Sequence, residues 1–519
     1  MDERSTDHPL GLINRVARRS RRLHRHVDRS DVDGLVEETL RYTPKTEPFP
    51  HQAKGTLAAA RARNYAIFFE PRLGKSKTAL DYVGILSLKG EVRKVLILAP
   101  KIAIPVWERQ IRLHFPYNYE AETFTEQWGE NGNDSLPTVQ FWLAGREETF
   151  RRVRGSKKSG KIFYQRSKQD IVEAWDPDVI VVDESHEYKR PGGVGAQDLW
   201  HLVRRLRKKR GDGRPYVLLL SGTPNPKGWR DLFAQFRIMD DGIFGTSADS
   251  FDQEYVIYGR GKRRWTIIAY RKEKKLDKLV RRHSIAASAD EVGLANEQFF
   301  ERLPVTLPPS VVKMYHQLVE EFMVEWEGGV ISAKNSGVRR LRLLQLCGGF
   351  TTQGEQIHSA KVDALKSYLQ LLYLQGESVV VYSRFTAEVE AAHRTIQEVG
   401  FVSHRVDGST SARDRRLAID SLATRPSLPT AIAFQHQAGS RAIELVGAAE
   451  TVYYSPPDGW VDYWQTLKRT QGPNQHRPVR YTHLVVPGTV DISVIKSLQR
   501  KEDWHADLMR NPRRYLTGL

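Results

Sequence analysis

The sequence predicts an α/β protein with two parallel-sheet domains in tandem and a helical insertion between them. Three observations predict this class: short apolar runs of strand length, helical patterns between those runs, and the return of this alternation after a stretch that lacks it. Continuous apolar strands separated by helices are typical of a parallel sheet covered on both faces. The 519 residues suit two or three domains, and the 40% hydrophobic content can fill their cores.

The first set of apolar runs predicts a domain over residues 46–245, and the second predicts another over residues 356–505. The expected strands of the first domain are 66–69, 95–98, 179–182 and 217–220. Those of the second are 378–382, 402–406, 430–434, 451–454 and 481–486.

The residues between the two sets, 246–355, lose the alternation and are expected to form the helical insertion and a linker. Helices are expected there over 276–282, 311–326 and 341–346. Residues 1–45 are expected to form a basic N-terminal arm, and 506–519 a C-terminal tail.

The composition favours a polyanionic partner and disfavours a membrane. The 80 Lys and Arg against 62 Asp and Glu give a net charge of +18, which favours nucleic acid. The arginine cluster at 15–29 is either a phosphate-binding arm or a solvated tail. One cysteine, Cys347, excludes a disulfide framework and fits a reducing cytoplasm. The compact build favours the cytoplasm of a microbial or viral host cell. No apolar run approaches the roughly 18 residues that span a bilayer.

Gly74-Lys75-Ser76 stands between an expected strand, 66–69, and the helical pattern 78–88. This context is typical of a phosphate-binding loop, in which helix N-terminal amides face phosphates, Lys75 reaches the β- and γ-oxygens and the Ser76 hydroxyl ligates Mg²⁺. The segment departs from the usual spacing because Phe69 stands where a first glycine is expected.

Asp183 and Glu184 follow directly on the expected strand 179–182. Adjacent carboxylates at a strand end can hold Mg²⁺ through Asp183 while Glu184 polarises an attacking water. Ser221-Gly-Thr-Pro224 follows the next expected strand. The order of these three segments along the chain is that of a nucleotide hydrolase. His186 is either part of this site or a structural histidine.

With these motifs on the chain, the sequence resembles the superfamily 2 helicases, and among them the compact, microbial or phage-type Swi/Snf-like double-stranded DNA translocases. The resemblance covers roughly residues 46–500 and implies two RecA-like domains. The further segments that carry it are Phe49–Gly55, Leu98–Lys101 continuing to Trp107, Leu232–Met239, Phe251 with Tyr255, Lys278–Arg282, Leu341–Cys347, Val379–Phe385, and Val406–Thr410 with Arg415.

The resemblance implies a role for each candidate site residue. It implies ATP and Mg²⁺ as cofactors, with Mg²⁺ held by Ser76 and Asp183. The implied catalytic residues are Lys75, Asp183, Glu184 and Arg469. The implied nucleotide-binding residues are Gln52, Arg72, Gly74, Lys75 and Ser76. Arg72, at the place of the family's usual glycine, either adds charge there or faces solvent. Ser221, Thr223 and Gln465 are implied to couple ATP hydrolysis to domain movement. The implied nucleic-acid contacts are Lys101, Trp107, Arg384 and the basic loop with Arg154, Lys157 and Lys158.

Two departures from the family pattern bear on catalysis. Ala442 and Glu444 replace a glycine and an asparagine, and Gly472 stands where the family's second arginine is expected. A transition-state arginine contributes on the order of 10³–10⁵ in rate. Three alternatives follow: Arg469 serves as that arginine, Arg477 does so from beyond the motif, or turnover is slow.

The implied function is an ATP-dependent translocase that moves along double-stranded DNA, with ATP bound between its two domains. One alternative is a DNA or RNA helicase that separates strands. Another is a nucleic-acid-binding scaffold with a weak or decayed ATPase, and a third is the motor subunit of a restriction or defence complex. The sequence leaves the oligomeric state open, and a monomer is compatible with it.

Overall fold

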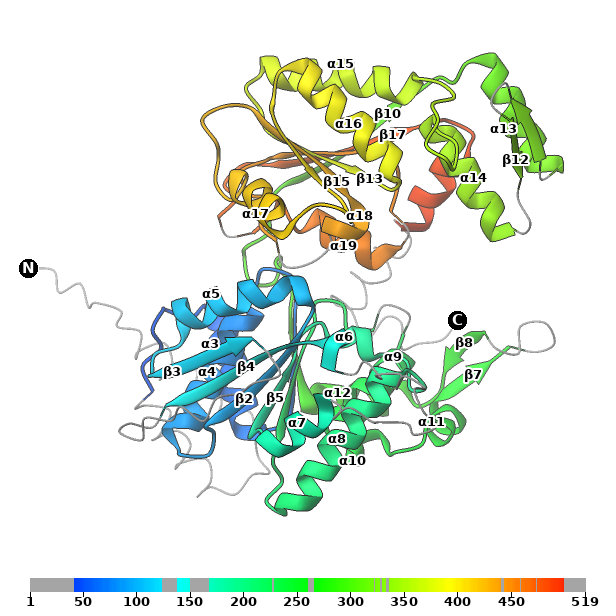
Figure 1. Ribbon diagram of the computed structural model, residues 1–519. Coiled ribbons are helices and arrows are strands. Elements are labelled where there is room, and N and C mark those ends of the chain that lie inside the picture. Colours follow the sequence, from blue (N-terminus) through cyan, green and yellow to red (C-terminus); the bar gives the residue numbers. More distant parts are fainter. Residues whose placement is uncertain are drawn as a thin grey trace, which may run out of the picture. The chain divides into compact units, whose positions relative to one another are not determined.

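The computed structural model describes residues 42–123, 138–149, 168–225, 228–259, 266–321, 323–326, 329–332, 336–439, 443–457, 459–472 and 474–498. The chain divides into two compact units, with the boundary between Val292 and Gly293, and each unit is described by itself (Figure 1). The arginine cluster of the expected arm, the expected C-terminal tail, Ala442, and Arg154, Lys157 and Lys158 of the basic loop lie outside the described residues.

The first unit is built on a seven-stranded parallel sheet with the order β3-β4-β2-β5-β6-β1-β9. Its strands are β1 (Tyr65–Phe69), β2 (Lys94–Ala99), β3 (Tyr119–Thr123), β4 (Val139–Gly145), β5 (Val179–Val182), β6 (Tyr216–Leu220) and β9 (Ser284–Ala287). The four strands expected from apolar runs are therefore the neighbouring strands β2, β5, β6 and β1. Their carboxyl ends meet at one edge of the sheet.

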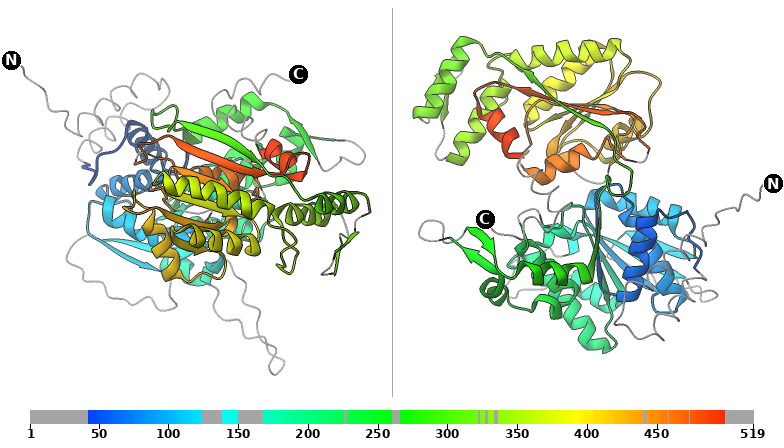
Figure 2. Two further views of the ribbon diagram at one scale, coloured as in Figure 1. Left: turned by 90° about the horizontal axis from the view of Figure 1, so that it is seen from above. Right: turned by 180° about the vertical axis from the view of Figure 1, so that it is seen from behind.

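Helices cover both faces of this sheet (Figures 1 and 2). One face carries α3 (Pro50–Ala62) and α4 (Lys75–Leu88), and α5 (Ile104–His114) packs beside α4. The remaining elements of the unit are η1 (Lys101–Ala103), α6 (Arg146–Thr149), α7 (Lys168–Trp175), η2 (Ser185–Tyr188), α8 (Val194–Arg210), α9 (Arg230–Met239), α10 (Asp241–Phe244), α11 (Ala248–Tyr255), β7 (Val256–Tyr258), β8 (Ile267–Tyr270) and α12 (Glu273–His283).

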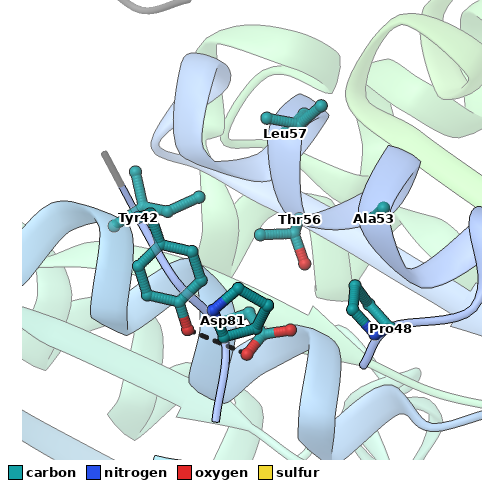
Figure 3. Close-up of a pocket in the computed structure, with 8 residues that line it drawn as sticks. Tyr42, Pro48, Ala53, Thr56, Leu57 and Asp81 are labelled. Carbon is teal, nitrogen blue, oxygen red and sulfur yellow. Dashed lines mark hydrogen bonds between the residues drawn. The ribbon is translucent and has the colours of Figure 1, made fainter. Parts of the chain in front are cut away.

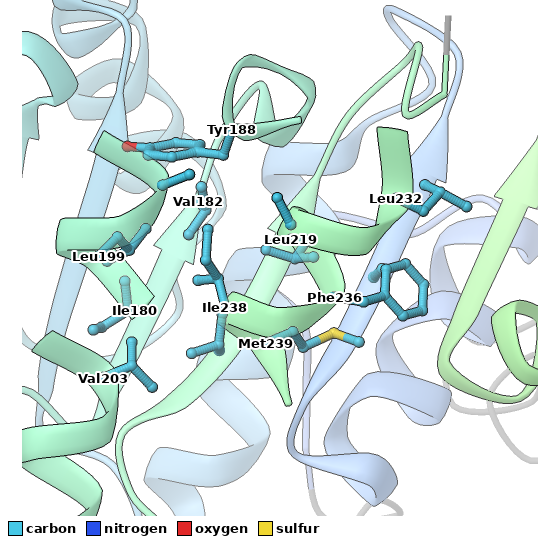
Figure 4. Close-up of a cluster of buried hydrophobic side chains, with 14 of the residues drawn as sticks. Ile180, Val182, Tyr188, Leu199, Val203, Leu219, Leu232, Phe236, Ile238 and Met239 are labelled. Carbon is cyan, nitrogen blue, oxygen red and sulfur yellow. The ribbon is translucent and has the colours of Figure 1, made fainter. Parts of the chain in front are cut away.

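The core on the other face is formed by alternate strand residues and the apolar sides of α8 and α9. Ile180, Val182 and Leu219 point from the sheet toward these two helices (Figure 4). Leu199 and Val203 meet them from α8, and the apolar side of α9 adds Leu232, Phe236, Ile238 and Met239. This packing fixes β5 and β6, so that the polar segments after both strands have a rigid base.

The second unit contains a six-stranded parallel sheet with the order β10-β17-β16-β13-β15-β14. Its strands are β10 (Gln298–Pro304), β13 (Val379–Ser383), β14 (Val402–Val406), β15 (Thr430–Gln435), β16 (Glu450–Tyr453) and β17 (Val479–Val485). With the first sheet, this confirms the predicted fold class of two tandem RecA-like α/β domains.

Two buried clusters sandwich the second sheet. Helices α15 (Ala360–Leu374) and α16 (Thr386–Val399) pack on one face, and α17 (Ala412–Ser421) and α19 (Trp460–Leu467) on the other (Figure 1). The unit also contains α13 (Pro309–Glu321), the hairpin β11 (Met323–Trp326) with β12 (Gly329–Ser332), α14 (Ser336–Gly348) and α18 (His436–Gly439).

The region 246–355, expected to form a mostly helical insertion and a linker, also contains strands. It contains the hairpin β7–β8, and it supplies β9 to the first sheet and β10 to the second. The helix expected over 311–326 ends at Glu321, because Met323–Trp326 pairs antiparallel with Gly329–Ser332. Both added strands are the outermost of the described strands in their sheets. Such strands need not carry the continuous apolar run that marks a central parallel strand.

Candidate active site

The loop between β1 and α4 has the backbone of a phosphate-binding loop. Gly74 has a φ of +81°, which favours glycine, and a Cβ atom there would displace the side-chain amide of Gln52. Lys75 opens α4, and its Nζ donates to the carbonyls of Phe69 (3.0 Å) and Glu70 (3.3 Å). The ammonium group is thus held at the end of β1, and Ser76 lies beside it in the first turn of the helix.

Gln52 joins the segment before α3 to this loop. Its Oε1 accepts from the Phe49 backbone N–H (3.1 Å), and its Nε2 donates to the carbonyl of Leu73 (3.1 Å). The Nε2 of His51 lies 2.8 Å from the same carbonyl. Gln52, an expected nucleotide-binding residue, therefore lies directly against the phosphate loop. His51 is a neighbour that the motif comparison missed, although it stands inside the matched segment.

The chain leading to Gln52 is anchored to α4 and α5. The Tyr42 hydroxyl donates to Asp81 (2.9 Å) beside a small pocket between this segment, α3 and α4 (Figure 3). Lys45 donates to the carbonyl of Arg112 (2.7 Å), and the Thr46 hydroxyl lies 2.6 Å from His114 Nδ1. These contacts fix the start of α3 and with it the position of Gln52.

Asp183 and Glu184 stand at the end of β5, next to β6 and β2 in the sheet. The Asp183 carboxylate accepts from the Trp107 indole N–H at Oδ2 (2.9 Å) and from the Glu184 backbone N–H at Oδ1 (2.9 Å). Burial and, after it, the charge of Glu184 raise the pKa of Asp183 to about 6, against the opposing effects of the Trp107 hydrogen bond and the charge of the nearby Lys75. Lys75 and Asp183 are therefore close enough to interact, as a shared phosphate and metal site requires.

A chain of polar contacts connects Glu184 with the segment after β6. The Nδ1 atom of His186 lies 3.3 Å from Glu184 Oε2 and 3.1 Å from the Ser221 hydroxyl. The Ser221 hydroxyl in turn accepts from the Thr223 backbone N–H (3.1 Å). His186 thus takes the position of a link between the expected base and the expected coupling segment.

The coupling segment also touches the phosphate loop. A Cβ atom at Gly222 would lie 2.9 Å from Pro71 Cδ, so this close approach favours glycine. Gln235 of α9, which the sequence comparison did not single out, accepts from the Ser185 hydroxyl (2.8 Å) and donates to the Pro224 carbonyl (2.6 Å). The segments after β1, β5 and β6 therefore form one contiguous site.

The donor set fits Mg²⁺ held jointly with a nucleotide. One carboxylate and one hydroxyl, Asp183 and Ser76, are the oxygen ligands that Mg²⁺ takes when phosphates and water complete its shell. Among the described residues, no three His, Cys, Asp or Glu side chains gather to hold a metal by themselves. Arg72 has a φ of +73° in this loop, a conformation that is uncommon for a non-glycine residue.

Two expected nucleic-acid contacts lie in very different surroundings in this unit. Lys101 is exposed at the start of η1, directly after β2. Trp107 is only 2% exposed, and its indole N–H is engaged by Asp183. The expectation that Trp107 contacts nucleic acid is therefore corrected to a contact with the expected metal ligand. The amphipathic pattern of α5 could have indicated this, because Trp107 lies on the buried side with Ile104 and Ile111.

In the second unit, Arg384 follows β13, and its guanidinium lies 5.5 Å from the centre of the Phe385 ring. Its backbone N–H donates to the Ser455 hydroxyl (2.8 Å), which fixes the end of the strand. Gln465 is buried in α19.

The arginines expected to complete the site both contact their own unit. Arg469 donates from Nη1 to the Ile443 carbonyl (3.2 Å), and Arg477 forms an ion pair with Glu377 (2.6 Å) and donates to the Gly447 carbonyl (3.0 Å). Gly472 has a φ of +129°, and its N–H donates to Asn296 Oδ1 (2.9 Å).

Comparisons with known proteins agree with the motifs. Residues 360–471 match the model of the helicase conserved C-terminal domain. Protein CHROMATIN REMODELING 19 of Arabidopsis thaliana is 21% identical over 83% of this chain and 64% of its own length. The ISWI chromatin-remodeling complex ATPase ISW1 of Saccharomyces cerevisiae is 22% identical over 87% of this chain and 40% of its own length. The chain thus spans less than two thirds of either relative.

A solved structure, the Sulfolobus solfataricus SWI2/SNF2 ATPase core in complex with dsDNA, aligns with 90% of this chain and 94% of its own. The TM-score is 0.39 and the identity is 16%. Within the described ranges, no helix has the length and apolar character needed to cross a membrane. The matched C-terminal domain and these relatives agree with the resemblance seen in the motifs: the chain is similar to superfamily 2 helicases with a Swi/Snf-like ATPase core.

Proposed function

We propose that the protein is an ATP hydrolase that couples hydrolysis to movement along double-stranded DNA. The observation that carries this proposal is the convergence of Lys75, Asp183, Glu184 and Ser221 at the carboxyl ends of the neighbouring strands β1, β5 and β6. In open parallel sheets, ligands bind outside the carboxyl ends of the strands. Nucleotide hydrolysis is the chemistry that a lysine loop and paired carboxylates at this edge support best.

The chain's own residues would divide the work as follows. Lys75 exchanges the carbonyls of Phe69 and Glu70 for phosphate oxygens, because a charged acceptor makes the stronger hydrogen bond. Gln52 orients the base, and Glu184 accepts a proton from the attacking water. Mg²⁺, when held by Asp183 and Ser76, would neutralise charge on the phosphate oxygens.

The polar contacts from Glu184 through His186 to Ser221 connect the site of hydrolysis with the segment after β6. A change at Glu184 during turnover alters its 3.3 Å contact with His186, which also contacts Ser221. Gly222 lies close to Pro71 of the phosphate loop, so a movement of that loop on phosphate binding would also displace the segment after β6. We propose that Ser221, Thr223 and Gln465 couple ATP hydrolysis to domain movement. We also propose that Arg469 or Arg477 of the second unit takes the role of the family arginine whose position is occupied by Gly472. Arg72 would add positive charge at the phosphates.

Duplex DNA is proposed as the polymer because of the basic excess of this chain and the chromatin functions in the names of its relatives. Lys101 and Arg384 are the described candidates for phosphate contacts, and Arg154, Lys157 and Lys158 are candidates outside the described residues. Contacts to phosphates carry no sequence information directly, so we expect binding that is independent of sequence and weakens steeply with salt.

The test is an ATPase assay with duplex DNA, single-stranded DNA and RNA, together with displacement of a third strand from a triplex. Duplex DNA is expected to stimulate turnover most, and triplex displacement is expected to require ATP. Lys75→Ala and Glu184→Gln are expected to abolish both activities, with Glu184→Gln still binding ATP. Stimulation only by single strands or RNA, or displacement that survives Lys75→Ala, would overturn the proposal.

A nucleic-acid-binding scaffold with a decayed ATPase is the second candidate. The observation that favours it is the engagement of Arg469 and Arg477 by groups of their own unit, together with glycine at position 472. It predicts DNA binding without ATP turnover, and unchanged binding in Lys75→Ala.

A further inference from the structure

Trp107 holds one oxygen of a carboxylate that the proposed mechanism assigns to Mg²⁺. Its indole N–H donates to Asp183 Oδ2 at 2.9 Å, while the Glu184 backbone N–H donates to Oδ1 at 2.9 Å. Each oxygen therefore has one fixed donor and retains acceptor capacity for a metal. Groups that donate a hydrogen bond to a metal-ligating side chain fix its orientation, and their loss usually lowers metal affinity or activity about 10–100-fold.

The two donors come from different parts of the first unit. Glu184 belongs to the same strand end as Asp183, so its N–H moves together with that carboxylate. Trp107 belongs to α5, a helix 76 residues earlier in the chain that packs against α4 and β4. A displacement of α5 would therefore change the donor on Oδ2 while the donor on Oδ1 remained in place.

Helix α5 also touches two other parts of the proposed machinery. Its N-terminal end follows η1, where Lys101 is exposed as a candidate phosphate contact. Its C-terminal end receives Lys45 at the Arg112 carbonyl (2.7 Å), and its His114 Nδ1 lies 2.6 Å from the Thr46 hydroxyl. Thr46 precedes Gln52 by one short segment. Helix α5 thus adjoins the candidate DNA contact Lys101, donates to the expected metal ligand Asp183, and contacts the segment that leads to Gln52.

We propose that Trp107 is a positioning residue that sets the Asp183 carboxylate for Mg²⁺, and that α5 carries the effect of DNA bound at Lys101 to that carboxylate. This inference rests on the proposed function. It assigns to α5 a specific role in DNA stimulation: DNA tightens the binding of Mg²⁺ with ATP through one hydrogen bond.

The substitution Trp107→Phe removes the N–H and keeps most of the buried ring. The chain offers a matched control, because the Trp200 indole also donates to a carboxylate, Asp241 Oδ2 (3.2 Å), from α8 in the same unit. Trp200→Phe therefore removes the same kind of hydrogen bond outside the site. Trp107→His, which keeps a ring N–H, is a second variant that separates loss of the donor from loss of packing.

The measurement is the fluorescence of a labelled ATP titrated with Mg²⁺, with and without duplex DNA, in Glu184→Gln protein that cannot turn over. Trp107→Phe is expected to raise the half-saturating Mg²⁺ concentration about 10–100-fold and to remove the effect of DNA on it. Trp200→Phe is expected to change it less than about 2-fold, and Trp107→His to recover part of the loss. Thermal unfolding of each variant, compared with that of the parent protein, checks its fold.

Two outcomes would overturn the inference. One is a Trp107→Phe protein that binds Mg²⁺ and labelled ATP as the parent does. The other is an equal response to DNA in Trp107→Phe and in the parent. A parent protein that binds no labelled ATP at any Mg²⁺ concentration would instead refute the proposed function.

Discussion

The departure at Gly472 can be tested directly, because Gly472→Arg restores the residue that the family pattern has at this position. The backbone at Gly472 has a φ of +129°, which residues with a side chain rarely adopt. The local backbone is also tied down: its N–H donates to Asn296 Oδ1 (2.9 Å), and Asn296 Nδ2 donates to the Gln475 carbonyl (2.5 Å). The loop cannot rotate to a relaxed φ without losing these hydrogen bonds.

We therefore expect Gly472→Arg to destabilise the second unit by about 1–3 kcal/mol, the usual cost of a residue held in a sparsely populated backbone region. For a unit of this size, each kcal/mol lowers the midpoint of thermal unfolding by about 2–4 °C. Gly472→Ala carries the same backbone cost without the guanidinium and is the matched control. Both variants should unfold earlier than the parent protein by a similar amount.

The same variant tests which arginine assists catalysis. If the parent lacked a transition-state arginine and position 472 could supply it, kcat for ATP would rise on the order of 10³-fold. We expect no such rise, because the φ of +129° at Gly472 is one that arginine rarely adopts. In addition, Arg469 or Arg477 is proposed to act as the transition-state arginine. A DNA-stimulated ATPase assay and a thermal melt decide the matter. A Gly472→Arg protein that melts with the parent and gains two or more orders of magnitude in kcat would refute this reasoning.

Three further changes test other parts of the structure. Gly74→Ala places a Cβ atom onto the Gln52 amide at a φ of +81°, so labelled ATP should bind at least about 100-fold more weakly, and parent-like binding would contradict the loop geometry. Arg72→Gly removes a side chain at a φ of +73°, so the midpoint of thermal unfolding should rise by a few degrees while ATP affinity falls; unchanged affinity would place Arg72 outside the nucleotide site. Burial raises the pKa of Glu450 to about 7, and the charge of Glu377 adds to this shift while Arg480 opposes it. The folded state therefore holds this proton more tightly than the unfolded state, and the free energy of unfolding should fall as pH rises from about 4.5 to 7. In urea unfolding, Glu450→Gln should reduce the difference in the free energy of unfolding between pH 5 and pH 8 by up to about 3 kcal/mol. The same pH dependence in Glu450→Gln and in the parent protein would contradict the burial of this carboxyl.

Most central strands could be predicted because each carries its own signal, although the central strand β4 (Val139–Gly145) was not expected. β5 and β6 are continuous apolar runs, and their packing between helices on both faces requires such runs. Three edge strands, β3, β9 and β10, were missed, whereas the edge strand β14 was expected. Edge strands are partly exposed, as in Tyr119–Thr123, where no residue is buried. Their pairing depends on a neighbour that lies far away in the chain.

The residue types of the site were also set by local sequence. Lys75 after a strand and Asp183 at the end of another predict a phosphate site, because the carboxyl ends of parallel strands lie at one edge. The surroundings of Trp107 could not be predicted in this way. Its neighbours in sequence resemble a strand-contact motif, whereas its partner Asp183 lies 76 residues away.

The sequence by itself determined the two parallel-sheet domains, the order of the motifs and the resemblance to superfamily 2 helicases, since periodicity and local motifs are properties of adjacent residues. Only the tertiary structure decided that His186 connects Glu184 with Ser221, that Trp107 faces the expected metal ligand, and that Gly472 adopts a φ of +129°, which residues with a side chain rarely adopt. The physical reason is that hydrogen bonds and close contacts depend on distance in space, and that distance is set by how the strands pair and the helices pack.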